Sequence, residues 1–211
     1  MSSFPKAVAA VGLPLAWSNW ALPGLGLGVR GRTAANAGFA TAYAAAFHGT
    51  PNWRCAKGFR YGLVSAALVA AGYGVALAIP SLRKSLRAVP DRGPEVAPAE
   101  WIAVHIPVGT VYSEEMIFRA TLNPLLDNAF GSRAGTALGA LAFGLWHVHP
   151  ARVAGDSVPA TVAVTAAGGV AFGWLRRRTE SITAPALLHA AVNMGGALAP
   201  RIARLIESAD K

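Results

Sequence analysis

The chain has 211 residues, of which 54% are hydrophobic and only 14% are charged. Soluble domains contain about 25% charged residues, so this composition argues against an ordinary soluble domain and favours a multi-spanning membrane protein. The formal net charge of +9 could suggest a nucleic-acid-binding protein. However, the basic residues fall between apolar stretches and form no basic patch interleaved with aromatic residues. We therefore expect the lipid bilayer as a partner of this chain, and no nucleic acid.

A helix that crosses a bilayer needs about 20 mostly apolar residues. Taken in chain order, the stretches that approach this length predict about seven transmembrane helices, at residues 7–28, 34–49, 60–80, 101–127, 134–149, 157–175 and 182–206. The second and fifth stretches are short, so one of them is expected to be tilted or re-entrant. The expected fold class is an all-α, polytopic membrane helical bundle, and the length suits a single membrane domain over residues 1–211.

The first apolar stretch is interrupted by Asn19 and Pro23, and no clean cleavage site follows it. This pattern favours a first membrane helix over a removed signal peptide. Residues 81–100 form the one long hydrophilic stretch and contain several prolines, which predicts a linker. Cys55 is the only cysteine, so the chain can form neither an internal disulfide nor a thiolate metal site.

Three polar clusters interrupt the later apolar stretches. They are Glu114-Glu115-Met116-Ile117-Phe118-Arg119, Phe143-Gly144-Leu145-Trp146-His147 and His189-Ala190-Ala191-Val192-Asn193. A charged side chain at the centre of a membrane helix costs about 2.5–3.5 kcal/mol, so such groups usually face one another or a water-filled cavity and mark functional sites. Residues four apart share one face of a helix, so Glu115 can pair with Arg119. Glu114 then points about 100° away and is free for chemistry.

Glutamate and histidine together can activate water and transfer protons, which points to hydrolysis within the membrane. The side chains expected to converge on one cavity are Glu114, His147, His189 and Asn193. Other interpretations stay open. Taken alone, the pair Glu115–Arg119 would be structural, and either histidine could be a hydrogen-bond donor between helices. The whole set could also serve a transporter or channel as a proton relay, or persist in a non-catalytic membrane scaffold.

The motifs EExxxR, FxxxH and HxxxN, in this order on successive membrane helices, resemble those of the CPBP family. This family comprises CAAX proteases and bacteriocin-processing enzymes and is also called the ABI family. The resemblance covers about residues 100–200, the expected catalytic core. It implies an intramembrane endopeptidase that hydrolyses a peptide bond of a membrane-associated peptide or protein. The Ala/Gly/Arg-rich composition looks bacterial, so we expect a multi-pass protein of the bacterial plasma membrane and an unprenylated substrate.

The resemblance also implies roles for single residues. It implies that Glu114 activates water with His147 as its partner, and that His189 and Asn193 stabilise the oxyanion. The residues that resemble supporting positions are Glu115, Arg119 and Phe143.

The polar clusters leave open whether the expected hydrolysis uses a metal ion. A His₂Glu set with an open position is an established catalytic zinc site, which makes Glu114, His147 and His189 the alternative ligands. The sequence lacks an HExxH motif. Arg119 lies one turn from Glu114 and would repel a divalent cation, and the polar groups suffice for hydrolysis by themselves. We therefore expect no metal cofactor.

Overall fold

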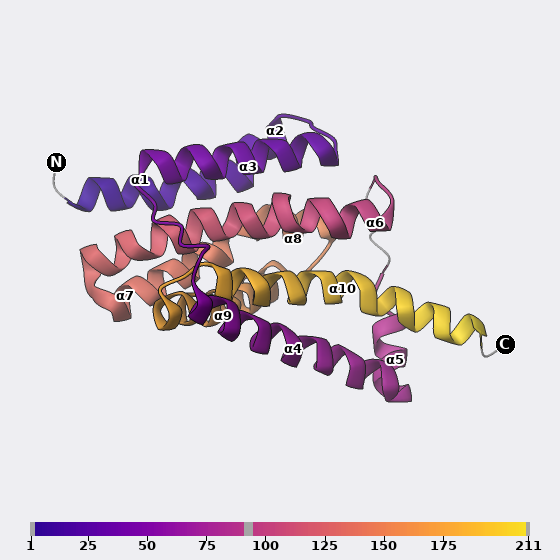
Figure 1. Cartoon of the computed structure of the whole chain (residues 1–211). Helices are drawn as coiled ribbons and strands as arrows, with labels where there is room; N and C mark the ends of the chain where they lie inside the picture. The colour runs from indigo at the N-terminus through magenta and orange to yellow at the C-terminus, as the bar shows by residue number, and fades with distance from the viewer. Residues whose placement is uncertain (1–2, 91–94, 210–211) are drawn as a thin grey trace.

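The computed structural model describes residues 3–90 and 95–209, and within these residues it contains helices and loops but no strand (Figure 1). The all-α fold class is thus confirmed. In chain order, the helices are α1 (Ser3–Ala16), η1 (Trp17–Ala21), α2 (Leu22–Gly24), α3 (Val29–Ala46), α4 (Ala56–Ala78), α5 (Pro80–Arg87), α6 (Pro98–Glu100), η2 (Trp101–Tyr112), η3 (Glu115–Leu122), α7 (Asn123–Trp146), α8 (Val148–Ala154), α9 (Val158–Thr179) and α10 (Thr183–Ala209).

Several of these helices follow one another without a break. The segments α1, η1 and α2 form one N-terminal helix, and α6, η2, η3 and the first part of α7 form one long helix. Gly131 splits α7 into two arms, which fold back on each other (Figure 1). Its φ of 80° and ψ of 161° suit a residue without a Cβ atom. Each predicted apolar stretch therefore lies in a helix, and Gly131 makes the turn between the fourth and fifth.

The long helix is π-helical along η2 and η3, so its backbone hydrogen bonds join residues five apart. Pro107 lies inside η2 and has no N–H to donate, which favours a departure from α-helical geometry. The hydroxyl of Thr121 likewise donates to the carbonyl of Met116, five residues back, at 2.8 Å. π-Helical turns are frequent at functional sites, and here η3 contains the first polar cluster from Glu115 to Arg119.

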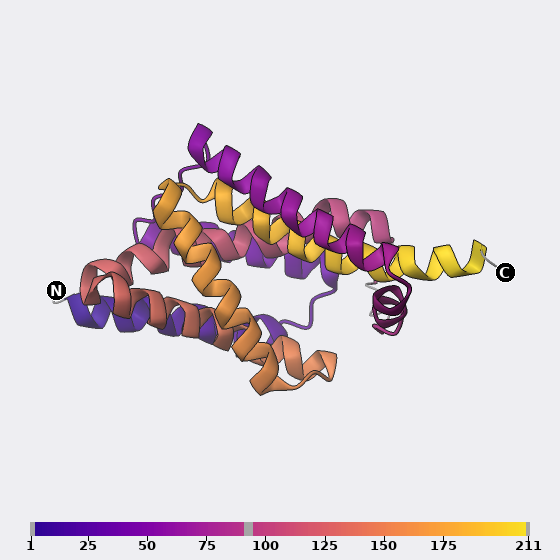
Figure 2. The same cartoon turned by 90° about the horizontal axis from the view of Figure 1, so that it is seen from below.

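Two pairs of helices pack closely side by side (Figure 2). α4 and α10 run parallel, because Gly62 near the start of α4 meets Leu187, and Tyr73 further along meets Gly195. The second arm of α7 runs antiparallel to α9. There, a Cβ atom on Gly144 would lie 2.7 Å from the carbonyl oxygen of Val162, so a glycine is needed for this close approach.

The main hydrophobic core lies where the N-terminal helices meet η3, α7 and α9. Its fully buried side chains include Phe118, Leu122, Leu126 and Ile182, and partly buried side chains from α1 and α3 cover it. The first polar cluster thus lies in the main core, where close packing holds its side chains.

Among the described residues, two helices, α4 and α9, are long and apolar enough to cross a membrane. Length and composition are weak evidence by themselves, because a core helix of a soluble protein meets the same criteria. The seven predicted membrane crossings therefore stay a prediction.

Candidate active site

Three elements bring the polar clusters together. Glu114 and Glu115 lie where η2 joins η3, and Arg119 follows about one turn later. Trp146 ends α7, and His189 lies in the first half of α10. These side chains come from segments far apart in the sequence, so their contacts depend on how the helices pack.

One oxygen of Glu114 accepts a hydrogen bond, and the other faces His189. The indole Nε1 of Trp146 donates a hydrogen bond to Oε1 of Glu114 at 3.1 Å. The second oxygen, Oε2, lies 3.7 Å from Nε2 of His189 and has no hydrogen-bond partner among the described residues. A carboxylate fixed in this way is oriented and can still accept a proton.

His189 lies between the two carboxylates. Its Nδ1 is 2.9 Å from Oε1 of Glu115, while its Nε2 faces Glu114. The same Glu115 oxygen lies 3.5 Å from the Arg119 guanidinium, so the predicted pair Glu115–Arg119 is confirmed. Both members are almost fully buried. The ion pair thus holds the carboxylate that orients the His189 ring.

Aromatic rings surround the Arg119 guanidinium. The ring of Phe143 lies 4.1 Å from its Cζ atom, that of Phe172 lies 4.8 Å away and that of Phe118 lies 5.7 Å away. A cation this close to ring faces is attracted by their π-electrons, and more strongly when it is desolvated. The guanidinium makes no hydrogen bond within the described part of the chain. It is held by the Glu115 charge and by these rings.

The structure does not join the other two predicted catalytic residues to Glu114 directly. His147 is partly buried, and its Nδ1 is hydrogen-bonded to the carbonyl of Phe143 at 2.8 Å. Its ring meets the Phe143 ring edge-on, with the centroids 5.0 Å apart. The Asn193 amide donates to the carbonyl of His189 at 3.3 Å. Glu114 and His189 are therefore brought together, while His147 and Asn193 lie nearby and bond within their own helices.

The N-terminal helix supports the second cluster from outside the motifs. The hydroxyl of Ser18 donates to the carbonyl of Trp146 at 2.6 Å, and the Asn19 amide donates to the carbonyl of Leu145 at 3.1 Å. The Asn19 side chain also accepts a bond from the backbone N–H of His149 at 2.8 Å. Carbonyls at the end of a helix lack partners within it. Two residues of η1 supply these partners and so fix the end of α7.

A comparison with protein families matches residues 97–195 to the family described as type II CAAX prenyl endopeptidase Rce1-like. The matched range contains all three motifs, including both carboxylates and Asn193. Residues 97–195 are thus similar to this family over slightly less than half of the chain. The resemblance to CPBP proteases is thereby confirmed. Neither the curated proteins nor the solved structures include a match to this chain.

The Rce1-like region does not assemble the alternative zinc ligands. No group of three His, Cys, Asp or Glu side chains within residues 3–90 and 95–209 could hold a metal ion. Glu114 and His189 are neighbours, but the structure gives no contact between either of them and His147. The donor set Glu114, His147 and His189 therefore does not fit a zinc ion in this arrangement.

Two contact residues of this Rce1-like site were not among the expected site residues. Trp146 belongs to the second cluster and lies three residues after Phe143 on the same helical face. Its place in the site could therefore have been predicted from the sequence. Phe172 stacks on the His189 ring, with centroids 4.8 Å apart and planes 24° apart. It lies in an apolar run of α9, where nothing in the sequence distinguishes it from other core residues.

Proposed function

We propose that this protein is an intramembrane endopeptidase that hydrolyses a peptide bond of a membrane-associated peptide or protein, with Glu114 as the base that activates water. The observation that carries the proposal is the pairing of Glu114 with His189 inside a region of a CAAX-protease family. A protease family implies a peptide or protein substrate.

The exposed apolar helices support a position within a membrane. α4 exposes large apolar side chains along its length, namely Phe59, Leu63, Val64, Leu68 and Val75. α9 exposes Val164, Val170 and Trp174 in the same way. Continuous apolar surface of this kind marks contact with lipid or with another protein. We therefore propose a multi-pass bundle in which the long helices cross the membrane, and a location in a bacterial plasma membrane.

The proposed reaction assigns proton transfer to Glu114. Its oxygen Oε2 takes a proton from water while the water oxygen attacks the carbonyl carbon of the substrate peptide. The carbonyl oxygen becomes an oxyanion, which His189 and a reoriented Asn193 amide stabilise by donating hydrogen bonds. Protonated Glu114 then gives its proton to the leaving amine as the C–N bond breaks. The products are one carboxylate-ended and one amine-ended peptide.

Accessibility favours Glu114 over Glu115 as this base. The Glu114 side chain is 7% exposed, whereas the Glu115 side chain is 0% exposed and contacts both Arg119 and His189. Oε2 of Glu114 is itself buried, but water would displace fewer contacts there than at Glu115. His147 is proposed as a second proton carrier. Its Nδ1 bonds to the carbonyl of Phe143, which leaves Nε2 to exchange a proton.

This reaction needs no metal ion, because a carboxylate base and neutral or cationic donors supply all of its steps. Purified protein should retain its activity in a chelator and should carry less than one metal ion per chain. Elemental analysis with about one zinc per chain, and activity lost to the chelator and restored by zinc, would contradict this part of the proposal.

The deciding experiment compares cleavage of a membrane-associated reporter peptide by the full chain reconstituted in liposomes. Glu114→Gln keeps the shape of the side chain but removes the base, so the rate should fall by roughly 10²–10⁴-fold while the fold is retained. Glu180→Gln makes the same chemical change at an exposed residue and is the matched control. Proton flux across the same liposomes without peptide cleavage would favour a proton relay in its place.

A further inference from the structure

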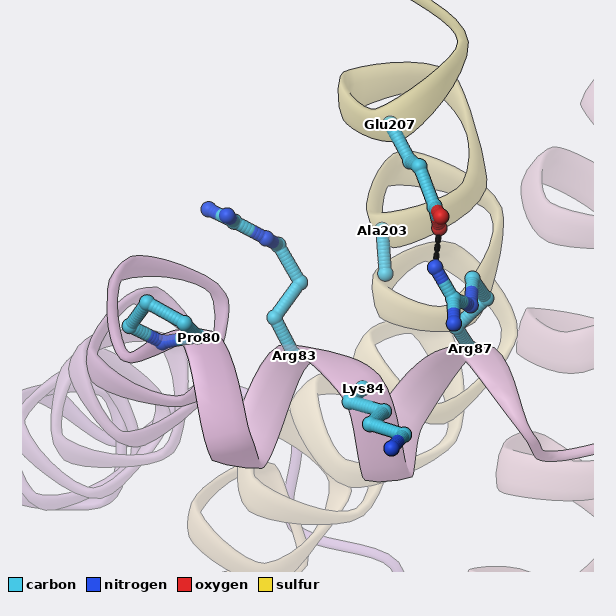
Figure 3. Close-up of a pocket in the computed structure, with 6 residues that line it drawn as sticks. All are labelled: Pro80, Arg83, Lys84, Arg87, Ala203 and Glu207. Atoms are coloured by element: carbon cyan, nitrogen blue, oxygen red, sulfur yellow. Dashed lines mark ion pairs between the residues drawn. The ribbon is translucent and has the colours of Figure 1, made fainter. Parts of the chain in front are cut away.

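A pocket of about 230 Å³ lies between α5 and α10, away from the candidate active site (Figure 3). Its lining residues are Pro80, Arg83, Lys84, Arg87, Ala203 and Glu207. None of them takes part in the proposed hydrolysis, so the function of this pocket can be considered separately.

The pocket is built by a break in the chain after α4. Ile79 is extended, with φ of −86° and ψ of 118°, and Pro80 then starts α5. As a result, α5 turns away from the axis of α4 and meets the end of α10 (Figures 1 and 2). An ion pair between Arg87 and Glu207 joins the two helices, and Arg204 of α10 donates to the carbonyl of Val89 at 3.1 Å. Both walls of the pocket are thus fixed to each other.

Positive charge dominates the lining. The lining carries three cations, Arg83, Lys84 and Arg87, and one carboxylate, Glu207, which pairs with Arg87. Arg83 donates one hydrogen bond to the carbonyl of Leu77 at 3.2 Å. The remaining N–H groups of its guanidinium are available to a ligand. The Lys84 ammonium makes no hydrogen bond or ion pair with the described part of the chain, and it is exposed. The pocket therefore offers unused donors and an excess of positive charge to an anion.

Size and surroundings restrict the anion. A volume of about 230 Å³ is smaller than the roughly 300–1,000 Å³ of pockets that enclose whole drug-sized ligands, but it suits a small charged group. Arginine and lysine side chains bind phosphate by charge-assisted hydrogen bonds. Next to these cations, Ile79 and Leu82 expose large apolar side chains at the end of the apolar helix α4. Cations beside exposed apolar side chains at a helix end match the boundary between headgroups and acyl chains.

We propose that this pocket binds the phosphate group of an anionic lipid headgroup. The phosphate contacts Arg83 and Lys84 and competes with Glu207 for Arg87, while Ile79 and Leu82 face the acyl chains. The bound lipid then bridges α5 and α10 and stabilises the end of the bundle. This proposal does not rest on proteolytic activity.

The test uses the full chain in a neutral detergent, with binding followed by the rise in the unfolding temperature. The probes are short-chain phosphatidylglycerol, phosphatidylcholine with the same acyl chains, and inorganic phosphate. Phosphatidylglycerol should stabilise the wild type at concentrations where the other two probes do not. The double variant Arg83→Gln/Lys84→Gln should raise the dissociation constant by about thirtyfold. Each cation near a lipid surface contributes a factor of roughly five to the affinity.

A matched variant separates this pocket from general attraction to basic residues. Arg54→Gln/Lys57→Gln removes the same charge from the other end of α4, where both side chains are exposed, and should leave binding unchanged. Glu207→Gln removes the competing carboxylate and should tighten binding, which keeps the test informative if the double variant folds poorly. Equal weakening by both double variants, or no effect of any of them, would overturn the proposal. An equal rise in the unfolding temperature with inorganic phosphate would show that the bound phosphate need not belong to a lipid.

Discussion

At the scale of single residues, the buried charges around Arg119 are expected to affect both the stability of the fold and the proposed reaction. Arg119 and Glu115 are almost fully buried, and removing one partner of such a pair leaves the other charge without compensation. The rings of Phe143 and Phe172 lower the free-energy cost of burying the Arg119 charge, but they do not replace a counter-charge.

We predict that Glu115→Gln destabilises the protein by about 3–5 kcal/mol, because Arg119 loses its charged partner in the interior. Activity should fall as well, since His189 loses the carboxylate that orients its ring. The unfolding temperature in detergent and the cleavage rate measure the two effects, with Glu114→Gln in parallel. A stable but inactive Glu115→Gln, beside an unfolded Glu114→Gln, would reverse the two roles.

We predict that Trp146→Phe lowers kcat by roughly tenfold to a hundredfold, because a hydrogen bond to a charged group contributes about 1.5–3 kcal/mol. Phenylalanine keeps a ring against Phe118 but cannot donate to Glu114. The value of kcat should change more than KM, and the pH profile of the rate should shift. The exposed Trp174→Phe is the control. Unchanged kcat and pH profile would show that the indole does not position the base.

At the scale of helices, the sequence predicted where the apolar stretches lie but not how they are shaped. Hydrophobic length is a local property, so the positions of α4, α9 and α10 followed from composition. The π-helical turns of η2 and η3 depend on backbone bonding that hydrophobicity does not report. The turn at Gly131 was placed only approximately, because many glycines in this chain lie inside helices.

We predict that Gly144→Ala destabilises the protein by about 1–3 kcal/mol, because the new methyl group would press on the Val162 backbone between α7 and α9. The end of α7 would move with it, so the cleavage rate should also fall. Gly38→Ala in α3 is the control, since a Cβ atom there meets nothing within 4 Å. It should be neutral or stabilising by up to about 1 kcal/mol. Equal unfolding temperatures for both variants would contradict the close packing of α7 and α9.

At the scale of the whole molecule, polar contacts join the N-terminal helices to the family region. Arg30 binds both oxygens of Glu100, at 2.7 and 2.9 Å, and His105 contacts the same carboxylate at 3.2 Å. His105 also meets the hydroxyl of Thr33 at 2.7 Å. His105 thus links α3 to the N-terminal part of the long helix.

We predict a loss of stability in acid that depends on Glu100. Hydrogen bonds from Arg30, and then from His105, lower the pKa of Glu100 from about 4.5 to about 2. A carboxyl with a lowered pKa stabilises the folded state above pH 4.5, and this contribution disappears as the pH falls towards 2. Because Glu100 is partly exposed, water screens the effect and keeps it small. Unfolding temperatures measured from pH 6 to pH 2 should fall less for Glu100→Gln than for wild type. Parallel curves would contradict this contribution.

Helical geometry could predict the contacts of the candidate site that lie within one helix, but not those between helices. The pair Glu115–Arg119 lies within one helix, so helical geometry was enough to find it. The contacts of His189 with both carboxylates join residues more than 70 positions apart, and only the packing of α10 against the long helix creates them. The bonds from Ser18 and Asn19 to the end of α7 are equally remote in sequence.

The parallel course of α4 and α10 fixes the sidedness of the molecule. The ends of both helices, with α5 and its cations, lie at one end of the bundle (Figure 1). The loop before α4 lies at the other, where the Asn52 carbonyl accepts bonds from the backbone of Ile182 and from the Ser181 hydroxyl. The only cysteine, Cys55, is in that loop and contacts the Thr179 carbonyl. In the proposed membrane arrangement, labelling of this thiol by a reagent that cannot cross membranes would assign the α5 end to the opposite compartment, so one native side chain would report the orientation of the protein in a cell.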